Sequence, residues 1–177
     1  RDDRRYDDRD ARDDDRPPST GGRDTSYDAF YEDLEQYGRW QEHPRYGDIW
    51  VPEDARSGWR PYTLGSWTYT EEYGWYWTST EPWGWATYHY GRWAHDDRRG
   101  WFWVPGREWA PAWVTWRYSD DLVGWAPLPP DGYGFAYNDD FLTSSRYAPF
   151  WIFVAPRYLM TPGLNRYAEP ASRNARA

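Results

Sequence analysis

The chain contains no cysteine and no lysine, and Leu, Ile, Val and Met are scarce among its 177 residues. Without cysteine there are no disulfide bonds, thiolate metal sites or cysteine nucleophiles. A helical bundle is normally built from Leu, Ala and Met, so this composition argues against one. No apolar run approaches the roughly 18–20 residues that cross a bilayer, and no membrane span is expected. Because the first residue is not Met, we expect a processed or recombinant chain that has already lost any signal peptide.

A surplus of positive charge is also missing, because the formal net charge is −8 and the isoelectric point is about 4.9. Phosphate recognition needs clustered Lys and Arg, so we expect no nucleic acid partner. An anionic membrane surface is disfavoured for the same reason. All 21 basic residues are arginines. Arginine side chains stack on aromatic rings and form bidentate hydrogen bonds with carboxylates. A GC-rich genome would produce the same preference for Arg.

Aromatic residues take the place of the missing aliphatic ones: they make up 22% of the chain, with 16 Trp and 17 Tyr. Trp, Tyr, Phe and Thr suit a pleated, half-buried surface, which favours β-strands. Many of the tryptophans recur at intervals of eight residues: Trp59, Trp67 and Trp75, then Trp77, Trp85, Trp93, Trp101 and Trp109. This interval equals a strand of about five residues plus a tight turn, which is typical of an all-β meander.

Several tryptophans also occur in pairs two residues apart: Trp75 and Trp77, Trp83 and Trp85, Trp101 and Trp103. Residues two apart in a strand point to one face, so each pair is predicted to share a face, with Tyr76 and Phe102 turned the other way. Glycine-containing turns separate the units. The predicted strands lie near 48–52, 59–62, 66–70, 73–78, 84–89, 91–94, 100–104, 112–118, 122–126 and 149–155.

We therefore expect an all-β domain over residues 27–160, an antiparallel meander of short strands that forms a barrel or two packed sheets. Residues 27–37 carry apolar groups at helical spacing and predict a short N-terminal helix capped by Ser26. Residues 1–26 begin with a tract of eight Asp and six Arg and predict a disordered tail and linker, or alternatively a short helix held by Asp/Arg pairs. Residues 161–177 predict a flexible C-terminal tail, or an arm that docks on a neighbouring subunit.

An ordered series of motifs runs from Tyr31 to Pro130. It comprises Tyr31-Glu-Asp-Leu34, Tyr37-Gly-x-Trp40, Pro44-x-Tyr-Gly-x-x-Trp50-Val-Pro52, Gly58-Trp-x-Pro-Tyr62, Gly65-x-Trp67, Pro82-Trp-Gly-Trp-Ala86, Tyr88-His-Tyr-Gly-x-Trp93, Gly100-Trp-x-Trp-Val-Pro-Gly106 and Gly124-Trp-x-Pro-Leu128. This stretch resembles a tryptophan-rich bacterial family of unknown function that often follows a FecR-type domain in exported envelope proteins.

The resemblance implies export past the inner membrane, a periplasmic or extracellular location, and a non-enzymatic role. It implies no catalytic residues, since none are established for that family. One feature differs from the common layout, because a charged tract and not a FecR-like region precedes the Trp-rich block. A sensory or regulatory role therefore does not carry over from proteins that contain FecR.

Catalytic and metal sites are poorly supported by the residues themselves. The three histidines, His43, His89 and His95, match no standard zinc spacing, and no Gly-x-Ser-x-Gly elbow is present. Glu71, Glu72, Glu81 and Glu108 lie near turns between aromatic strands, where a glycoside hydrolase could pair two carboxyl groups. Nothing in the sequence marks one as buried and another as exposed. We expect no enzyme, no metal and no cofactor, with a glycoside hydrolase as a remote alternative.

The aromatic surplus favours a binding role, because a domain of this size has more rings than its interior needs. Sugar C–H faces stack on rings while Arg and Glu take the hydroxyl groups. The predicted ligand-binding residues are those that combine the two: Glu81, Trp83, Trp85, Glu108, Trp109, Trp113, Trp116 and Arg117. We expect the partner to be an envelope glycan or an envelope protein. The alternative is a self-assembling subunit of an extracellular layer or fibre, joined through strand edges.

Overall fold

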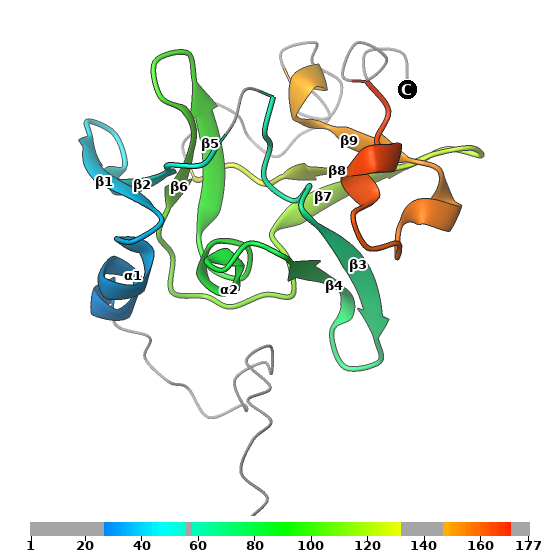
Figure 1. Ribbon diagram of the computed structural model, residues 1–177, viewed down its shortest axis with the longest axis horizontal. Helices are drawn as coiled ribbons and strands as arrows, with labels where there is room; N and C mark the ends of the chain where they lie inside the picture. Colours follow the sequence, from blue (N-terminus) through cyan, green and yellow to red (C-terminus); the bar gives the residue numbers. More distant parts are fainter. Residues whose placement is uncertain (1–26, 56–57, 132–146, 171–177) are drawn as a thin grey trace, which may run out of the picture.

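The computed structural model describes residues 27–55, 58–131 and 147–170. The Asp/Arg tract, Ser26 and the loop after Pro130 fall outside the described residues. Within the described part the fold is mostly β, as the composition predicts, with three antiparallel sheets around a central short helix (Figure 1). These strands do not close into a barrel, and they form three small sheets in place of two packed ones.

The four-stranded sheet has the order β1-β2-β6-β5, and the other two are β3-β4 and β7-β8-β9. The strands are β1 Gly38–His43, β2 Gly47–Pro52, β3 Gly65–Thr70, β4 Gly74–Ser79, β5 Arg92–Asp96, β6 Gly100–Val104, β7 Val114–Tyr118, β8 Val123–Pro127 and β9 Ile152–Val154. The helices are α1 Tyr27–Leu34 and α2 Gly84–Thr87, with 3-10 turns η1 Ala148–Phe150, η2 Pro156–Tyr158 and η3 Leu164–Tyr167.

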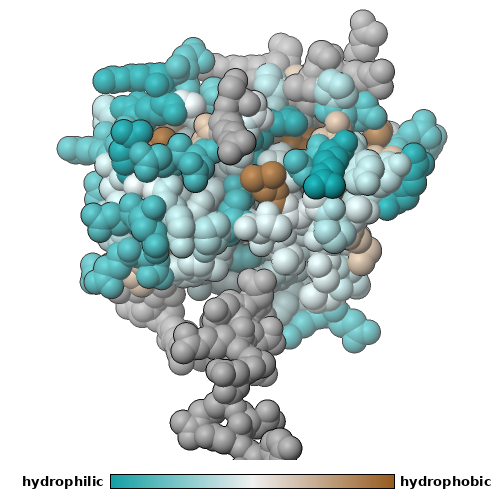
Figure 2. All heavy atoms as spheres, in the orientation of Figure 1, coloured by the Kyte–Doolittle hydropathy of each residue, from teal (hydrophilic) through white to brown (hydrophobic). Residues whose placement is uncertain are grey.

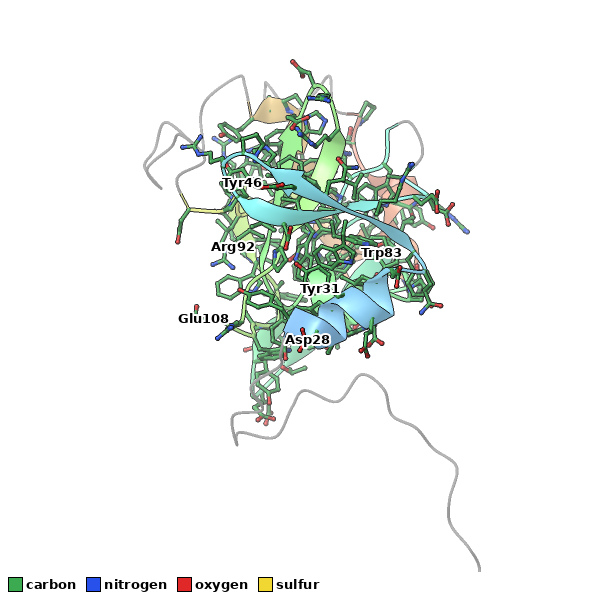
Figure 3. The ribbon with its side chains drawn as sticks, turned by 90° about the vertical axis from the view of Figure 1, so that its left-hand side faces the viewer. Asp28, Tyr31, Tyr46, Trp83, Arg92 and Glu108 are labelled. Carbon is green, nitrogen blue, oxygen red and sulfur yellow. The ribbon has the colours of Figure 1, made fainter. Side chains whose placement is uncertain are left out.

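Helix α1 confirms the helical spacing near the start of the domain. Phe30 and Leu34 are one turn apart and both are fully buried. The indole nitrogen of Trp50 donates to the Leu34 carbonyl over 3.0 Å, which satisfies an orphan acceptor at the end of the helix. Tyr31 extends from the helix toward the β1–β2 hairpin (Figure 3), where its ring lies 4.2 Å from that of Trp40.

Strand β6 shows the predicted alternation of side chains. Trp101 and Trp103 pack into the main core, while Phe102 packs with Ile49 and Ala94 in a smaller cluster on the other face. Both faces of the four-stranded sheet therefore carry apolar side chains.

The predicted strand at residues 84–89 is wrong, because this segment begins with helix α2. A side chain at position 84 could not fit, since a Cβ there would lie 2.5 Å from the Cβ of Ser79. Indoles from other elements donate to carbonyl groups at the end of the helix and in the segment that follows it. Trp93 donates to Thr87 over 2.9 Å, and Trp103 donates to Tyr90 over 2.8 Å. Tertiary hydrogen bonds thus stabilise a helix that the local Trp-x-Trp pattern does not predict.

The predicted strand at 59–62 is also wrong, because the chain turns there and Tyr62 adopts a left-handed φ of 59°. Three hydrogen bonds hold this residue: its hydroxyl donates to Tyr88 O over 2.9 Å and accepts from Trp113 N over 3.0 Å, and its carbonyl accepts from Trp125 Nε1 over 3.1 Å. A non-glycine residue in this region costs about 1–3 kcal/mol, which these partners offset.

The end of the domain contains less strand and more packing than predicted. Of the expected strand at 149–155, only Ile152–Val154 forms a strand, and the 3-10 turn Ala148–Phe150 precedes it. Leu164 is fully buried in the main core, so packing continues past residue 160. The predicted domain boundaries stay a prediction.

Candidate functional site

Most of the aromatic surplus is inside the molecule. More than half of the tryptophans are buried and none is classed as exposed, so among the described residues the exposed rings are tyrosines. The face seen in Figure 2 is mainly hydrophilic or intermediate in hydropathy, with hydrophobic residues in small separate islands. A binding surface must therefore be sought where rings reach the surface together.

One such place is an aromatic strip, which we define as Tyr69, Trp75, Trp116 and Tyr118. Tyr69 and Tyr118 are 60% and 70% exposed, and both tryptophans are partly buried. The ring centroids are 5.5 Å apart from Tyr69 to Trp75, 6.3 Å from Trp75 to Trp116, and 6.2 Å from Trp116 to Tyr118. The four rings form one continuous row across β3, β4 and β7.

Strand register places these rings side by side. Tyr69 faces Trp75 across the β3–β4 ladder, two positions outward from the buried pair formed by Trp67 and Trp77. On β7, Trp116 lies 4.5 Å from the ring of Trp67. The strip is thus the outward continuation of the core along one face of the strands.

A second feature is the carboxyl group of Glu81, between β4 and α2. Its Oε1 accepts from Trp59 Nε1 over 2.8 Å, and its Oε2 accepts from Ser79 Oγ over 3.3 Å and from the Tyr88 hydroxyl. The backbone N–H of Glu81 donates to Ser79 Oγ over 3.0 Å. The side chain joins the β4 end to the loop that carries Trp59.

Burial raises the pKa of Glu81 to about 7, although the hydrogen bonds from Tyr88, Trp59 and Ser79 act in the opposite direction. Burial of the Tyr88 hydroxyl, together with its contact with the Glu81 carboxyl group, raises the pKa of Tyr88 well above its ordinary value. A carboxyl group whose pKa lies near neutrality is a candidate functional residue, so Glu81 is considered for a functional role beside its structural one.

Glu81 lies between two clefts. One, of about 600 Å³, is lined by Asp33, Trp85 and His89 among others. The other, of about 670 Å³, is lined by Trp59, Trp83 and Asn165 among others. Three of the predicted ligand-binding residues, Glu81, Trp83 and Trp85, therefore meet at these clefts, but Trp83 is buried and offers little ring surface.

Two other predicted residues are engaged inside the protein. Trp109 belongs to a group of rings that includes Tyr73 at 4.9 Å and His89 at 5.8 Å. Trp113 donates its indole N–H to the carbonyl of His89 over 3.0 Å. The guanidinium of Arg92 covers the Trp113 ring, with its carbon 3.4 Å from the centroid.

The remaining predicted residues lie on different surfaces. Trp116 belongs to the aromatic strip, and Arg117 on the same strand lies over the Trp151 ring at 5.2 Å. Glu108 is exposed and lies well away from Trp83 in Figure 3. The structure does not bring the predicted set together in one site, and the ligand-binding role of each residue stays a prediction.

The sequence interpretation missed three residues of the strip: Tyr69, Trp75 and Tyr118. Their signal was present, since Tyr69 and Tyr118 stand two positions from Trp67 and Trp116 on the same strand faces. What the sequence does not reveal is that β7 packs beside β3 and β4.

Metal ligands are not gathered in the described part of the chain, where no group of three or more His, Asp and Glu could hold an ion. Within those same residues, no helix has the length and hydropathy needed to cross a membrane.

The structure thus defines a small, mostly β domain with a tryptophan core and an aromatic surface strip. Residues 31–132 match DUF6600, described as a family of unknown function. Because this match covers more than half of the chain, the protein belongs to DUF6600. Neither a curated protein nor a solved structure matches the chain.

Proposed function

We propose that this domain is a non-catalytic carbohydrate-binding module of the bacterial envelope, and that it binds glycan through the aromatic strip. The observation that carries the proposal is the continuous row of Tyr69, Trp75, Trp116 and Tyr118 at the surface. Pyranose rings present C–H faces that stack on indole and phenol rings. A row of four rings offers stacking positions to successive sugars of one chain.

Polar groups next to the strip supply hydrogen bonds for sugar hydroxyls. Glu71 and Glu72, in the β3–β4 turn that follows Tyr69, are exposed. The two tryptophans are anchored by the core, so little side-chain entropy is lost when a ligand stacks on them. Export to the periplasm or the cell exterior, where such glycans occur, is part of the proposal and is supported by the resemblance noted from the motifs.

The strip is tested by titrating chitohexaose and cellohexaose into the full chain by isothermal calorimetry. We expect the double variant Tyr69→Ala/Tyr118→Ala to weaken binding about tenfold or more, because each stacked ring contributes about 0.5–1.5 kcal/mol. Both side chains are exposed, so the fold should be retained.

The matched control is Tyr167→Ala. Tyr167 is 42% exposed and stacks on Tyr158, outside the strip. This variant is expected to bind as the wild type does. The proposal fails if neither saccharide binds, or if the double variant binds both as tightly as the control.

Self-assembly is the second function that the sequence suggested, and the sheet edges bear on it. The backbone N–H of Trp67 donates to Leu159 O over 3.2 Å, and that of Trp77 donates to Pro111 O over 3.1 Å. Loops therefore cover part of the edges of β3 and β4, which reduces the backbone available for pairing with another chain.

A further inference from the structure

A cleft of about 800 Å³ lies between the β1–β2 hairpin, the β5–β6 hairpin and η1. Its lining includes Arg39, Arg60, Arg99 and His95, and none of the described residues that line it is acidic. This concentration of three arginines contrasts with the net charge of −8. We call it the basic cleft.

Arg60 is a partly buried charge of the basic cleft. One guanidinium nitrogen donates to the carbonyl oxygens of Pro149 over 3.2 Å and Trp151 over 2.8 Å. Among the described residues no carboxylate pairs with it, and burial lowers the pKa of the guanidinium from its ordinary value. The two carbonyl groups fix the Arg60 side chain but accept hydrogen bonds from only one of its nitrogens. The other N–H groups of the guanidinium are therefore available as donors.

The other two arginines differ in how far they are neutralised. Arg39 on β1 is exposed and makes no ion pair with a described residue. Arg99 donates to Asp96 over 2.9 Å, which offsets part of its charge. Asp54 and Glu81 line the adjoining cleft, which shares Trp59 and Arg60 with the basic cleft. Within the basic cleft itself, the described lining residues include three arginines and no carboxylate.

Aromatic rings also contribute to the wall of the basic cleft. Trp59 and Trp101 both line the basic cleft. Trp59 is held by its hydrogen bond to Glu81, and Trp101 packs against Phe150 with centroids 4.9 Å apart. The combination of fixed aromatic rings and arginine guanidinium groups suits a ligand that has both an apolar face and an anionic group.

We infer that the basic cleft binds an acidic sugar, with its carboxylate or phosphate on Arg39 and Arg60 and its ring against Trp59. The guanidinium fork matches either anion in a bidentate manner. This site is separate from the aromatic strip and does not depend on the function proposed for that strip.

The test titrates tetragalacturonate and, separately, inorganic phosphate into the full chain by calorimetry, at low and at high salt. We expect tetragalacturonate to bind and its affinity to fall with added salt, because the contact is ionic. Arg39→Gln should weaken binding about fivefold, as for an exposed ion pair. Arg60→Lys keeps the positive charge but cannot form the bidentate hydrogen bonds of a guanidinium group, and it should weaken binding about tenfold.

Arg157→Gln is the matched control, because it removes the same charge from an exposed arginine outside the cleft. It should leave affinity unchanged, and Tyr69→Ala/Tyr118→Ala should also leave it unchanged. A response to phosphate alone, with the same dependence on Arg39 and Arg60, supports an anion site and identifies the anion as phosphate. Binding of neither probe, or equal losses in Arg39→Gln and Arg157→Gln, overturns the inference.

Discussion

At the scale of single residues, Glu81 shows how a side chain can serve packing and still remain titratable. Its carboxyl group is fixed by Trp59, Ser79 and Tyr88, and burial raises its pKa to about 7. The ordinary pKa is 4.5, so the folded protein holds this proton more tightly than the unfolded chain does. The stability that Glu81 contributes is therefore complete below pH 4.5 and is lost as the pH rises to about 7.

The substitution Glu81→Gln removes this titration. We expect the free energy of unfolding of the wild type to fall, relative to that of the variant, by about 2–3 kcal/mol between pH 4.5 and pH 8. Urea unfolding followed by tryptophan fluorescence at both pH values measures the difference.

Glu42→Gln, at an exposed position of β1, is the control for this experiment and should keep the pH dependence of the wild type. Parallel stability curves for the wild type and Glu81→Gln would contradict a raised pKa in the folded state.

Tyr62 is a second residue whose conformation depends on distant partners. Its left-handed φ is held by hydrogen bonds with Tyr88, Trp113 and Trp125, which are 26 to 63 positions away in the chain. No local sequence signal marks this position, because the left-handed region ordinarily requires glycine or asparagine.

At the scale of elements, the strands were largely predictable and α2 was not. The alternation of Trp101, Phe102 and Trp103 between two faces followed from strand periodicity and is confirmed. Strand β1 was not predicted, although its polar side chains face solvent in the manner of an edge strand. Helix α2 begins within the same Trp-x-Trp spacing as the strands, with Trp83 at its N-cap and Trp85 inside it. Indole donors from β5 and β6 bond to its last residue and to the segment after it.

The third sheet depends on a glycine that no periodicity reveals. Gly124 on β8 lies opposite Phe153 on β9, and a Cβ there would lie 2.3 Å from the Phe153 ring. We expect Gly124→Ala to lower the free energy of unfolding by about 2–3 kcal/mol, because the ring cannot move without disturbing buried neighbours. Urea denaturation measures the loss.

The variant Gly74→Ala is the comparison for Gly124→Ala, because it introduces backbone strain without steric overlap. Gly74 has a φ of 73° and open space around its Cβ position, so its substitution should cost about 1 kcal/mol. Equal losses at the two positions would show that Phe153 accommodates the added methyl group.

At the scale of the whole molecule, the surfaces that could join copies of the chain are partly covered. Loops bond to β3 and β4, and the outer strand β1 carries exposed Arg39 and Glu42. We expect the full chain to be monomeric, with a mass near 21.3 kDa by light scattering after size-exclusion chromatography. Filaments or large particles without ligand would favour the self-assembling subunit instead.

The sequence by itself determined the class of fold and which side chains share a face of each strand or helix. An excess of Trp and Tyr, alternation over two residues and turns at glycine specify short antiparallel strands, and the spacing of Phe30 and Leu34 specifies a helix. These signals are local, because each depends on residues a few positions apart.

Tertiary structure alone decided which faces are covered and which residues meet. The aromatic strip needs β7 beside β3 and β4, and the basic cleft needs Arg39, Arg60 and Arg99 to converge from three segments. The physical reason is that periodicity fixes the direction of a side chain relative to its own strand, whereas burial depends on the element that packs against it.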